Sequence, residues 1–198
     1  MGDWKQAQEW ERGWWGDCAN TYGEEEKQLV YANRMGLFPF HDGKGPYNFG
    51  LGGANVVDLG GGPTSLLLKC VNRGDRCKVI DPLPLPPWVT LRYRDCGIQY
   101  EQGQAEHVTD TGYDEAWIYN VLQHVEDPAL VIRRASRAAK IIRLFEWLGI
   151  ADGTGHLHAL EEAQLNEWLE GIGKVERLAE HGCDGMAYYG IFVGRMEL

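Results

Sequence analysis

The chain has 198 residues, of which 44% are hydrophobic and 24% charged, as expected for one globular domain with a sizeable core. Its net charge of −10 argues against a long nucleic-acid-binding surface, because affinity for phosphates needs clustered Lys and Arg. No apolar run is long enough to span a bilayer, and the acidic start "MGDWKQAQEW" is not typical of a signal peptide, so we expect a cytoplasmic protein without a membrane partner.

The first fifty residues differ from the rest in being rich in tryptophan. A helix is predicted over residues 24–36, because acids fill its first turn and Gly36 stands at its end. Before it, aromatic residues recur at helical spacing and favour packing against a neighbouring surface or a lid over a pocket. We therefore expect a helical cap over residues 1–50 and a separate ligand-binding domain over 51–198. The tryptophans of this cap are Trp4, Trp10, Trp14 and Trp15.

From residue 54 onward, short apolar runs alternate with helical patterns. Strands are predicted over 54–58, 77–81, 98–102, 114–122 and 141–147, helices over 64–74, 127–140 and 160–173, a loop over 82–87 and a hairpin over 174–198. This alternation predicts an α/β fold with a Rossmann-like, doubly wound sheet that is mostly parallel and has an antiparallel C-terminal strand. Ligands of such sheets bind beyond the carboxyl ends of the strands.

The run "VVDLGGGPTSLLLKC", residues 56–70, predicts a tight turn between a strand and a helix. Its glycines allow a ligand to approach the backbone closely, and Pro63 suits a first helical position. The free N–H groups of a helix start would face the same ligand. The turn therefore indicates a binding site that includes Asp58, Gly60, Gly61 and Gly62.

Two kinds of ligand fit such a turn. A dinucleotide fingerprint needs GxGxxG, and Ser65 stands at the position of the third glycine. With Asp58 before "LGGGP", the run instead resembles the motif of the class I S-adenosylmethionine (SAM)-dependent methyltransferases. That resemblance implies that Asp58 and the three glycines hold the methionine end of the cofactor, S-adenosyl-L-methionine.

The rest of the chain, over roughly residues 50–195, carries the later parts of the same pattern in order. By this resemblance, the acid of "VIDP" would bind the ribose hydroxyls, the polar residues of "GQAEHV" would hold adenine, and "DEAWIYNVLQHVEDP" would end its strand near the transferred methyl group. The implied cofactor-binding residues are Asp81, Gln104, Ala105, Glu106 and Asn120.

Methyl transfer to a hydroxyl benefits from a general base, whereas an amine can react without one. His124 lies in the fourth motif, where the family usually gives it a local structural role. His156 and His158, in "GHLHAL", and Glu146, at the end of the fifth strand, are further candidates near the acceptor. We expect no metal, because the two histidines lack a nearby third ligand and the five cysteines form no CxxC pair.

Taken together, the motifs predict a SAM-dependent methyltransferase that acts on an oxygen or nitrogen of a small-molecule acceptor. One alternative is an enzyme that methylates a nucleic acid or another macromolecule; another is a domain that binds SAM without turnover. The stripe of Arg133, Arg137 and Lys140 would support nucleic-acid binding, but such a stripe is typical of a solvated helix face. The oligomeric state stays open.

Overall fold

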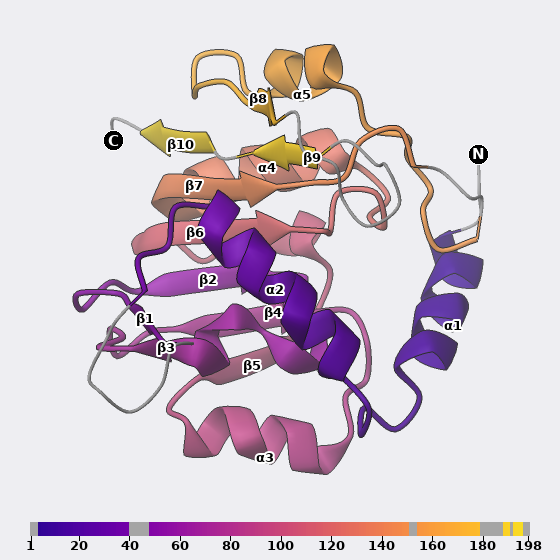
Figure 1. The fold of residues 1–198 in the computed structure, drawn as a ribbon, viewed down its shortest axis with the longest axis vertical. Helices are drawn as coiled ribbons and strands as arrows, with labels where there is room; N and C mark the ends of the chain where they lie inside the picture. The colour runs from indigo at the N-terminus through magenta and orange to yellow at the C-terminus, as the bar shows by residue number, and fades with distance from the viewer. Residues whose placement is uncertain (1–3, 40–47, 151–153, 179–187, 191, 196–198) are drawn as a thin grey trace.

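The structure, a computed structural model, describes residues 4–39, 48–150, 154–178, 188–190 and 192–195. Its centre is a six-stranded sheet within those residues, in which β2, β4, β5, β6 and β7 run parallel and β10 runs antiparallel to β7 (Figure 1). The mostly parallel, Rossmann-like sheet predicted from the sequence is confirmed. The strand order is β10 (Phe192–Arg195), β7 (Ala139–Phe145), β6 (Tyr113–Tyr119), β2 (Val56–Leu59), β4 (Lys78–Asp81) and β5 (Gln99–Gln102).

Helices cover both faces of this sheet, and two further strand pairs flank it. The strand pairs are β1 (Phe49–Gly50) with β3 (Cys70–Val71), which is parallel, and β8 (Glu176–Leu178) with β9 (Tyr188–Gly190), which is antiparallel. No helix in the described ranges is long and apolar enough to cross a membrane. The helices are α1 (Trp4–Trp15), α2 (Tyr22–Arg34), α3 (Pro87–Asp95), α4 (Pro128–Ala138) and α5 (Glu162–Trp168).

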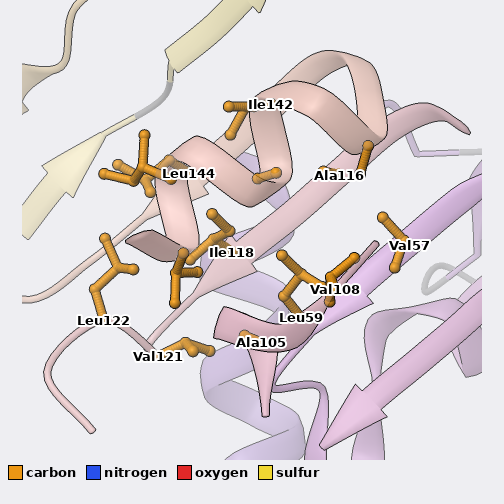
Figure 2. Packing of buried hydrophobic residues seen from close by; sticks show 14 of the residues in the cluster. Val57, Leu59, Ala105, Val108, Ala116, Ile118, Val121, Leu122, Ile142 and Leu144 are labelled. Atoms are coloured by element: carbon orange, nitrogen blue, oxygen red, sulfur yellow. The ribbon is translucent and has the colours of Figure 1, made fainter. Parts of the chain in front are cut away.

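One face of the sheet packs against α4 and α5. Alternate residues of each parallel strand point to this face, as the two-residue period of a strand requires. Figure 2 shows Leu59 of β2 near Ile118 of β6, with Leu144 of β7 on the far side of Ile118, and all three are buried in one apolar cluster. The same cluster includes or contacts four residues at helical spacing in and after α5: Leu165, Trp168, Leu169 and Ile172.

The opposite face carries α2, which crosses the sheet in front of β6, β2 and β4 (Figure 1). The intervening strand residues point here, among them the fully buried Trp117. Tyr31 of α2 stacks on Phe145 with 5.0 Å between the ring centroids. The helix predicted within the first fifty residues therefore packs directly on the sheet.

The prediction of a helix over residues 64–74 is wrong. Two short 3-10 turns, η1 (Gly62–Thr64) and η2 (Leu66–Lys69), follow the glycine turn, and the chain then enters β3. Ser65 has an extended backbone between them, and its hydroxyl accepts a hydrogen bond from the N–H of Leu67. Such local side-chain bonds compete with helix formation. The pairing of β3 with β1 also withdraws Cys70 and Val71 from any helix.

A second difference is α3, which was not predicted at all. The proline-rich stretch over 82–87 hid the start of this helix, yet Pro87 occupies an early helical position, where a missing N–H costs nothing. Val89 and Tyr93 of α3 are fully buried against the sheet. The helices predicted over 127–140 and 160–173 are present as the shorter α4 and α5.

An ion pair on the α2 face fixes this helix to two central strands. Nε of Arg143 lies 2.7 Å from Oε2 of Glu115, and the Arg143 guanidinium also donates to Oε1 at 2.9 Å. Its third nitrogen donates to the carbonyl oxygen of Met35, at the end of α2, at 2.7 Å. Only 17% of the Arg143 side chain and 11% of the Glu115 side chain are exposed, so solvent screens this pair weakly.

Removal of this arginine should destabilise the protein. Arg143→Ala would leave the Glu115 carboxylate mostly buried without its cation, which is expected to lower the free energy of unfolding by about 3 kcal/mol. Arg137→Ala, on the exposed side of α4, is the control and should change it by less than about 0.5 kcal/mol. Urea unfolding followed by circular dichroism measures both. Equal stabilities of the two variants would contradict the role of this pair.

Candidate active site

The glycine turn after β2 is fixed from one side by Asp58. The Asp58 side chain is fully buried, and its Oδ2 accepts hydrogen bonds of 2.5 Å from the hydroxyls of Ser65 and Tyr119. A Cβ atom on Gly61 would come within 2.6 Å of the same oxygen. The cavity lies on the other side of the turn, where Gly60, Gly61 and Gly62 line it and Asp58 does not. Asp58 thus fixes the turn from the side that faces away from the cavity.

Two glycines of the turn are required by its geometry. Gly60 has a φ of +77°, and a Cβ atom there would lie 2.6 Å from the side chain of Val121. Gly62 has a φ of +56°, and its Cβ position faces Trp15 and the Asp81 carboxylate at 3.7 and 3.9 Å. Side chains are disfavoured at both angles, and at Gly62 a side chain would also enter the cavity.

Asp81 ends β4 at the edge of the cavity. Its Oδ2 accepts a hydrogen bond from the N–H of Gly62, and its Oδ1 accepts one from the N–H of Leu83, both at 2.9 Å. Burial raises the pKa of Asp81 to about 6, although these two hydrogen bonds favour the charged form. Each carboxylate oxygen keeps a further lone pair, so Asp81 can still accept hydrogen bonds from a ligand's hydroxyl groups.

The polar residues after β5 also reach the cavity. Gln104, Ala105 and Glu106 all line it, at the start of η3 (Ala105–His107). Oε1 of Glu106 accepts hydrogen bonds from the backbone N–H groups of Glu126, at 2.8 Å, and Asp127, at 3.3 Å. This carboxylate therefore joins the third predicted motif to the start of α4.

The turn after β6 brings Asn120 to the cavity in a left-handed backbone conformation, with a φ of +57°. Its Oδ1 accepts a hydrogen bond of 2.8 Å from the Gln123 amide. Glu146, a predicted base, does not line the cavity. Its fully buried carboxylate accepts hydrogen bonds of 3.0–3.1 Å from the N–H groups of Val121 and Leu122. Burial raises the pKa of Glu146 to about 7, against the effect of these donors.

The three candidate histidines are separated by the structure. His124 and His156 line the cavity, and their ring centroids lie 4.7 Å apart. His158 does not line it, and its Nε2 lies 2.8 Å from the carbonyl oxygen of Val125. Within the described ranges, no three His, Cys, Asp or Glu side chains are placed to hold a metal ion.

A cavity of about 320 Å³ joins these motifs at the carboxyl ends of the parallel strands. The helix α1 forms its outer wall, and Figure 1 shows this helix beside those strand ends. Trp15 faces Gly62 and Asp81, whereas Trp10 meets the chain at Gly155. The residues that α1 contributes to the wall are Trp4, Gln8, Trp10, Glu11, Trp14 and Trp15.

Sequence reasoning missed several of these wall residues. Glu11 and Gln8 belong to no motif, and only the helical spacing of the neighbouring tryptophans indicated that α1 has an inward face. From α2, Lys27 and Gln28 line the cavity as well. Gln28 is anchored by a hydrogen bond of 2.8 Å to the Thr64 hydroxyl, which ties α2 to the glycine turn.

Comparison of the sequence with protein-family models and with curated proteins finds no match. Comparison with solved structures finds similar folds. A 1,6-didemethyltoxoflavin-N1-methyltransferase from Burkholderia thailandensis, with 1,6-didemethyltoxoflavin and S-adenosylhomocysteine (SAH) bound, has a TM-score of 0.58 and 14% identity over 96% of this chain and 90% of its own. A SAM-dependent methyltransferase from Thermotoga maritima, described as a possible histamine N-methyltransferase, has a TM-score of 0.51 and 14% identity over 91% and 94%.

The chain therefore has the fold of the class I SAM-dependent methyltransferases, as its four motifs predicted. The [4+2]-cyclase SpnF has the same kind of fold, with a TM-score of 0.57 and 18% identity over 84% of this chain and 78% of its own. A fold supports more than one chemistry, so the activity has to be argued from the site.

The buried carboxylates of the site should make stability depend on pH. Burial raises the pKa of Asp58 to about 7, although Ser65 and Tyr119 donate to it, and the pKa values of Asp81 and Glu146 are raised as well. Unfolded carboxyls titrate near about 4, so the folded protein binds more protons between there and about pH 7. The free energy of unfolding should therefore fall as pH rises through this window.

Urea unfolding at about pH 5 and about pH 8 checks this, with an expected loss of at least about 1 kcal/mol at the higher pH. Glu146→Gln should reduce the difference, because one titrating group is removed. A protein that becomes more stable between these two pH values would contradict the assignment.

Proposed function

We propose that this protein is a SAM-dependent methyltransferase that transfers a methyl group to an oxygen or nitrogen of a small molecule. The observation that carries the proposal is the convergence of the glycine turn and the Asp81 carboxylate on one cavity. The N–H of Gly62 donates to Asp81, so the two motifs form one surface. Gln104, Ala105 and Glu106 from a third strand and Asn120 from a fourth complete it.

These residues fit the cofactor by their chemistry. The glycine backbone would lie against the methionine end, Asp81 would accept hydrogen bonds from the ribose hydroxyls, and the segment of Gln104, Ala105 and Glu106 would hold adenine. The bound cofactor supplies a methyl group activated by its sulfonium. Trp15, Tyr31 and Tyr119 line the same cavity, and an aromatic ring that turns its face to the cofactor would favour that positive charge. The protein's main contribution is to orient the acceptor and exclude water.

A small acceptor suits the shape and charge of the site. The cavity is walled by α1 and α2, and its size falls at the lower end of the range for small-molecule pockets. The predicted basic stripe is divided between two elements and partly neutralised. Lys140 lies in β7 and pairs with Asp114 at 2.8 Å, and Arg133 of α4 lies 3.7 Å from Asp127. These contacts favour the solvated-face interpretation over a nucleic-acid surface. We also propose that residues 1–50 act as the cap of a domain over 51–198.

Formation of SAH from labelled SAM tests the activity itself. The purified protein would be incubated with pooled small metabolites, and methylated products would be identified by mass spectrometry. A transferase converts SAM to SAH only when an acceptor is present. A protein that binds SAH but never turns over SAM with any pool would support the binding-domain alternative.

Loss of the Asp81 carboxylate should weaken cofactor binding. Asp81→Ala removes a charged acceptor worth roughly 1.5–3 kcal/mol, so the Kd for SAM and SAH should rise by roughly 10–100-fold. Asp95→Ala, at an exposed position of α3, is the matched control and should bind normally. Isothermal titration calorimetry measures both variants, after thermal melts show that each is folded. Unchanged affinity in folded Asp81→Ala would refute the ribose assignment.

A side chain at Gly62 should block the cavity. Gly62→Val places a branched side chain toward Trp15 and Asp81 and is expected to abolish detectable SAH binding. Gly97→Val is the control, because Gly97 has a similar φ of +71° but no atom within 4 Å of its Cβ position. Both variants therefore carry similar backbone strain. Normal SAH binding by Gly62→Val would exclude the turn as the cofactor site.

A further inference from the structure

A carboxylate of the N-terminal helix meets a histidine of the turn after β6. Nδ1 of His124 lies 2.9 Å from Oε1 of Glu11 and 2.9 Å from the carbonyl oxygen of Gly155. Both side chains line the cavity, and only 15% of each is exposed. The contact thus joins α1 to the fourth motif inside the proposed active site.

These contacts determine which nitrogen of the ring carries the hydrogen. Both partners of Nδ1 are acceptors, so Nδ1 must be the protonated nitrogen of a neutral ring. Nε2 then holds the lone pair, and the Gln123 amide lies 3.3 Å from it. At that distance the amide is a weak donor, which a substrate hydroxyl can replace. In its neutral form the imidazole is therefore a proton acceptor at Nε2, and the Gln123 amide beside it also donates a hydrogen bond to Oδ1 of Asn120.

We propose that His124 is the general base of the transfer reaction and that Glu11 is the positioning residue that holds it in this state. The proposal rests on the proposed methyltransferase function and narrows its acceptor. A base is needed when the attacking atom carries a weakly acidic proton. The acceptor class is therefore a hydroxyl compound, such as a phenol, or an azole with an acidic N–H.

The step balances as a single displacement with proton transfer. The acceptor oxygen or nitrogen forms a bond to the methyl carbon, the bond from that carbon to sulfur breaks, and its electron pair remains on the sulfur as SAH forms. The acceptor's proton moves to Nε2 of His124. The resulting imidazolium is paired through Nδ1–H with the Glu11 carboxylate, and its proton later passes to water. Glu11 thus stabilises the charge that the ring acquires.

The other candidate groups are less suited to this role. Nε2 of His158 is engaged with the Val125 carbonyl outside the cavity, and Glu146 is surrounded by backbone donors. His156 packs its ring against that of His124, with 4.7 Å between the ring centroids. His124 combines a position in the cavity wall with a carboxylate partner, Glu11, at its Nδ1.

The charges around His124 come from several elements. Burial alone would lower the pKa of His124, but the hydrogen bond and charge of Glu11, followed by the Gly155 carbonyl and Glu146, raise it above the usual value. Asp81 also faces it electrostatically from β4, and the His156 ring packs on it. Loss of Glu11 should therefore lower the pKa of His124, whereas loss of a distant acid should not.

Nitrogen NMR of protein labelled at its histidines tests the first half of the proposal without an acceptor. The wild-type spectrum should show His124, identified by its absence from His124→Asn, as the Nδ1–H form when neutral. Glu11→Gln should lower the pKa of His124. Glu9→Gln, an exposed glutamate of the same helix, is the control and should leave it unchanged. An Nε2–H form in the wild type, or equal effects of the two variants, would overturn the proposal.

Transfer assays with labelled SAM test the second half. The probes are para-cresol, a phenol with a pKa of about 10 like tyrosine, the more acidic para-nitrophenol, benzimidazole, and quinoline, which has no proton to lose. His124→Asn should lower kcat for para-cresol by roughly 10²–10⁴-fold, and Glu11→Gln by roughly 10–100-fold, with a much smaller change in the Kd for SAH. Para-nitrophenol should be affected less, because more of it is already ionised. Glu11→Asp should recover part of the lost rate.

The outcomes separate this proposal from the broader one. Wild-type protein that does not bind SAH refutes the proposed function itself. Protein that binds SAH but methylates only quinoline, or none of the proton-bearing probes, overturns the acceptor class. Equal losses for both phenols, or a Glu11→Gln rate equal to that of Glu9→Gln, overturns the role of the Glu11–His124 pair.

Discussion

The buried carboxylate of Asp58 is the constraint on which the site depends. Its two hydroxyl donors belong to the segment after the glycine turn and to β6, so one side chain joins three parts of the chain. The same hydroxyls accept the N–H groups of Leu67 and Leu66, and Tyr93 of α3 bonds to the turn at Gly62. These hydrogen bonds fix the conformation of the glycine turn, which is followed by two short 3-10 turns and not by a long helix. A buried charge is costly unless it is hydrogen-bonded, which explains why the donors converge here.

The helix α1 is attached to the domain mainly through the site. Only Ala7 of this helix is buried, and Trp14 remains more than half exposed. Its inward contacts are the Glu11–His124 pair, the packing of Trp15 over Gly62 and the packing of Trp10 at Gly155. A helix with so little buried apolar surface has a low local stability. Contacts with a ligand in the cavity would therefore contribute much of the free energy that keeps α1 in place. Ligand binding and the position of α1 are therefore physically linked.

The parts of the structure that could be predicted are those that depend on patterns of neighbouring residues in the sequence. Strand periods and the acid or amide at each strand end gave the sheet and placed Asp81 and Asn120 at one edge. The Glu11–His124 contact could not be predicted, because its two residues lie in distant segments without a shared motif. His156 and His158 lie two residues apart and could not be told apart from the sequence. The path of the loop brings His156 to the cavity wall and turns His158 toward the Val125 carbonyl. The lost helix after Gly62 depended on a side-chain bond of Ser65, which propensity does not describe.

The site concentrates groups that lower stability at neutral pH. Asp58, Asp81 and Glu146 all have raised pKa values, so keeping each of them ionised costs free energy that apolar residues would not cost. Asp81 and Glu146 accept hydrogen bonds from backbone N–H groups of cavity-lining turns, and Asp58 accepts them from the hydroxyls of Ser65 and Tyr119. Asp81 lines the cavity, whereas Asp58 and Glu146 lie behind its wall. A cationic cofactor in the cavity would relieve part of the cost of their negative charge. Ionisable groups with shifted pKa values and strained backbone conformations concentrate at binding sites. The carboxyl edge of this sheet therefore holds buried polar groups, whereas the rest of the core is apolar.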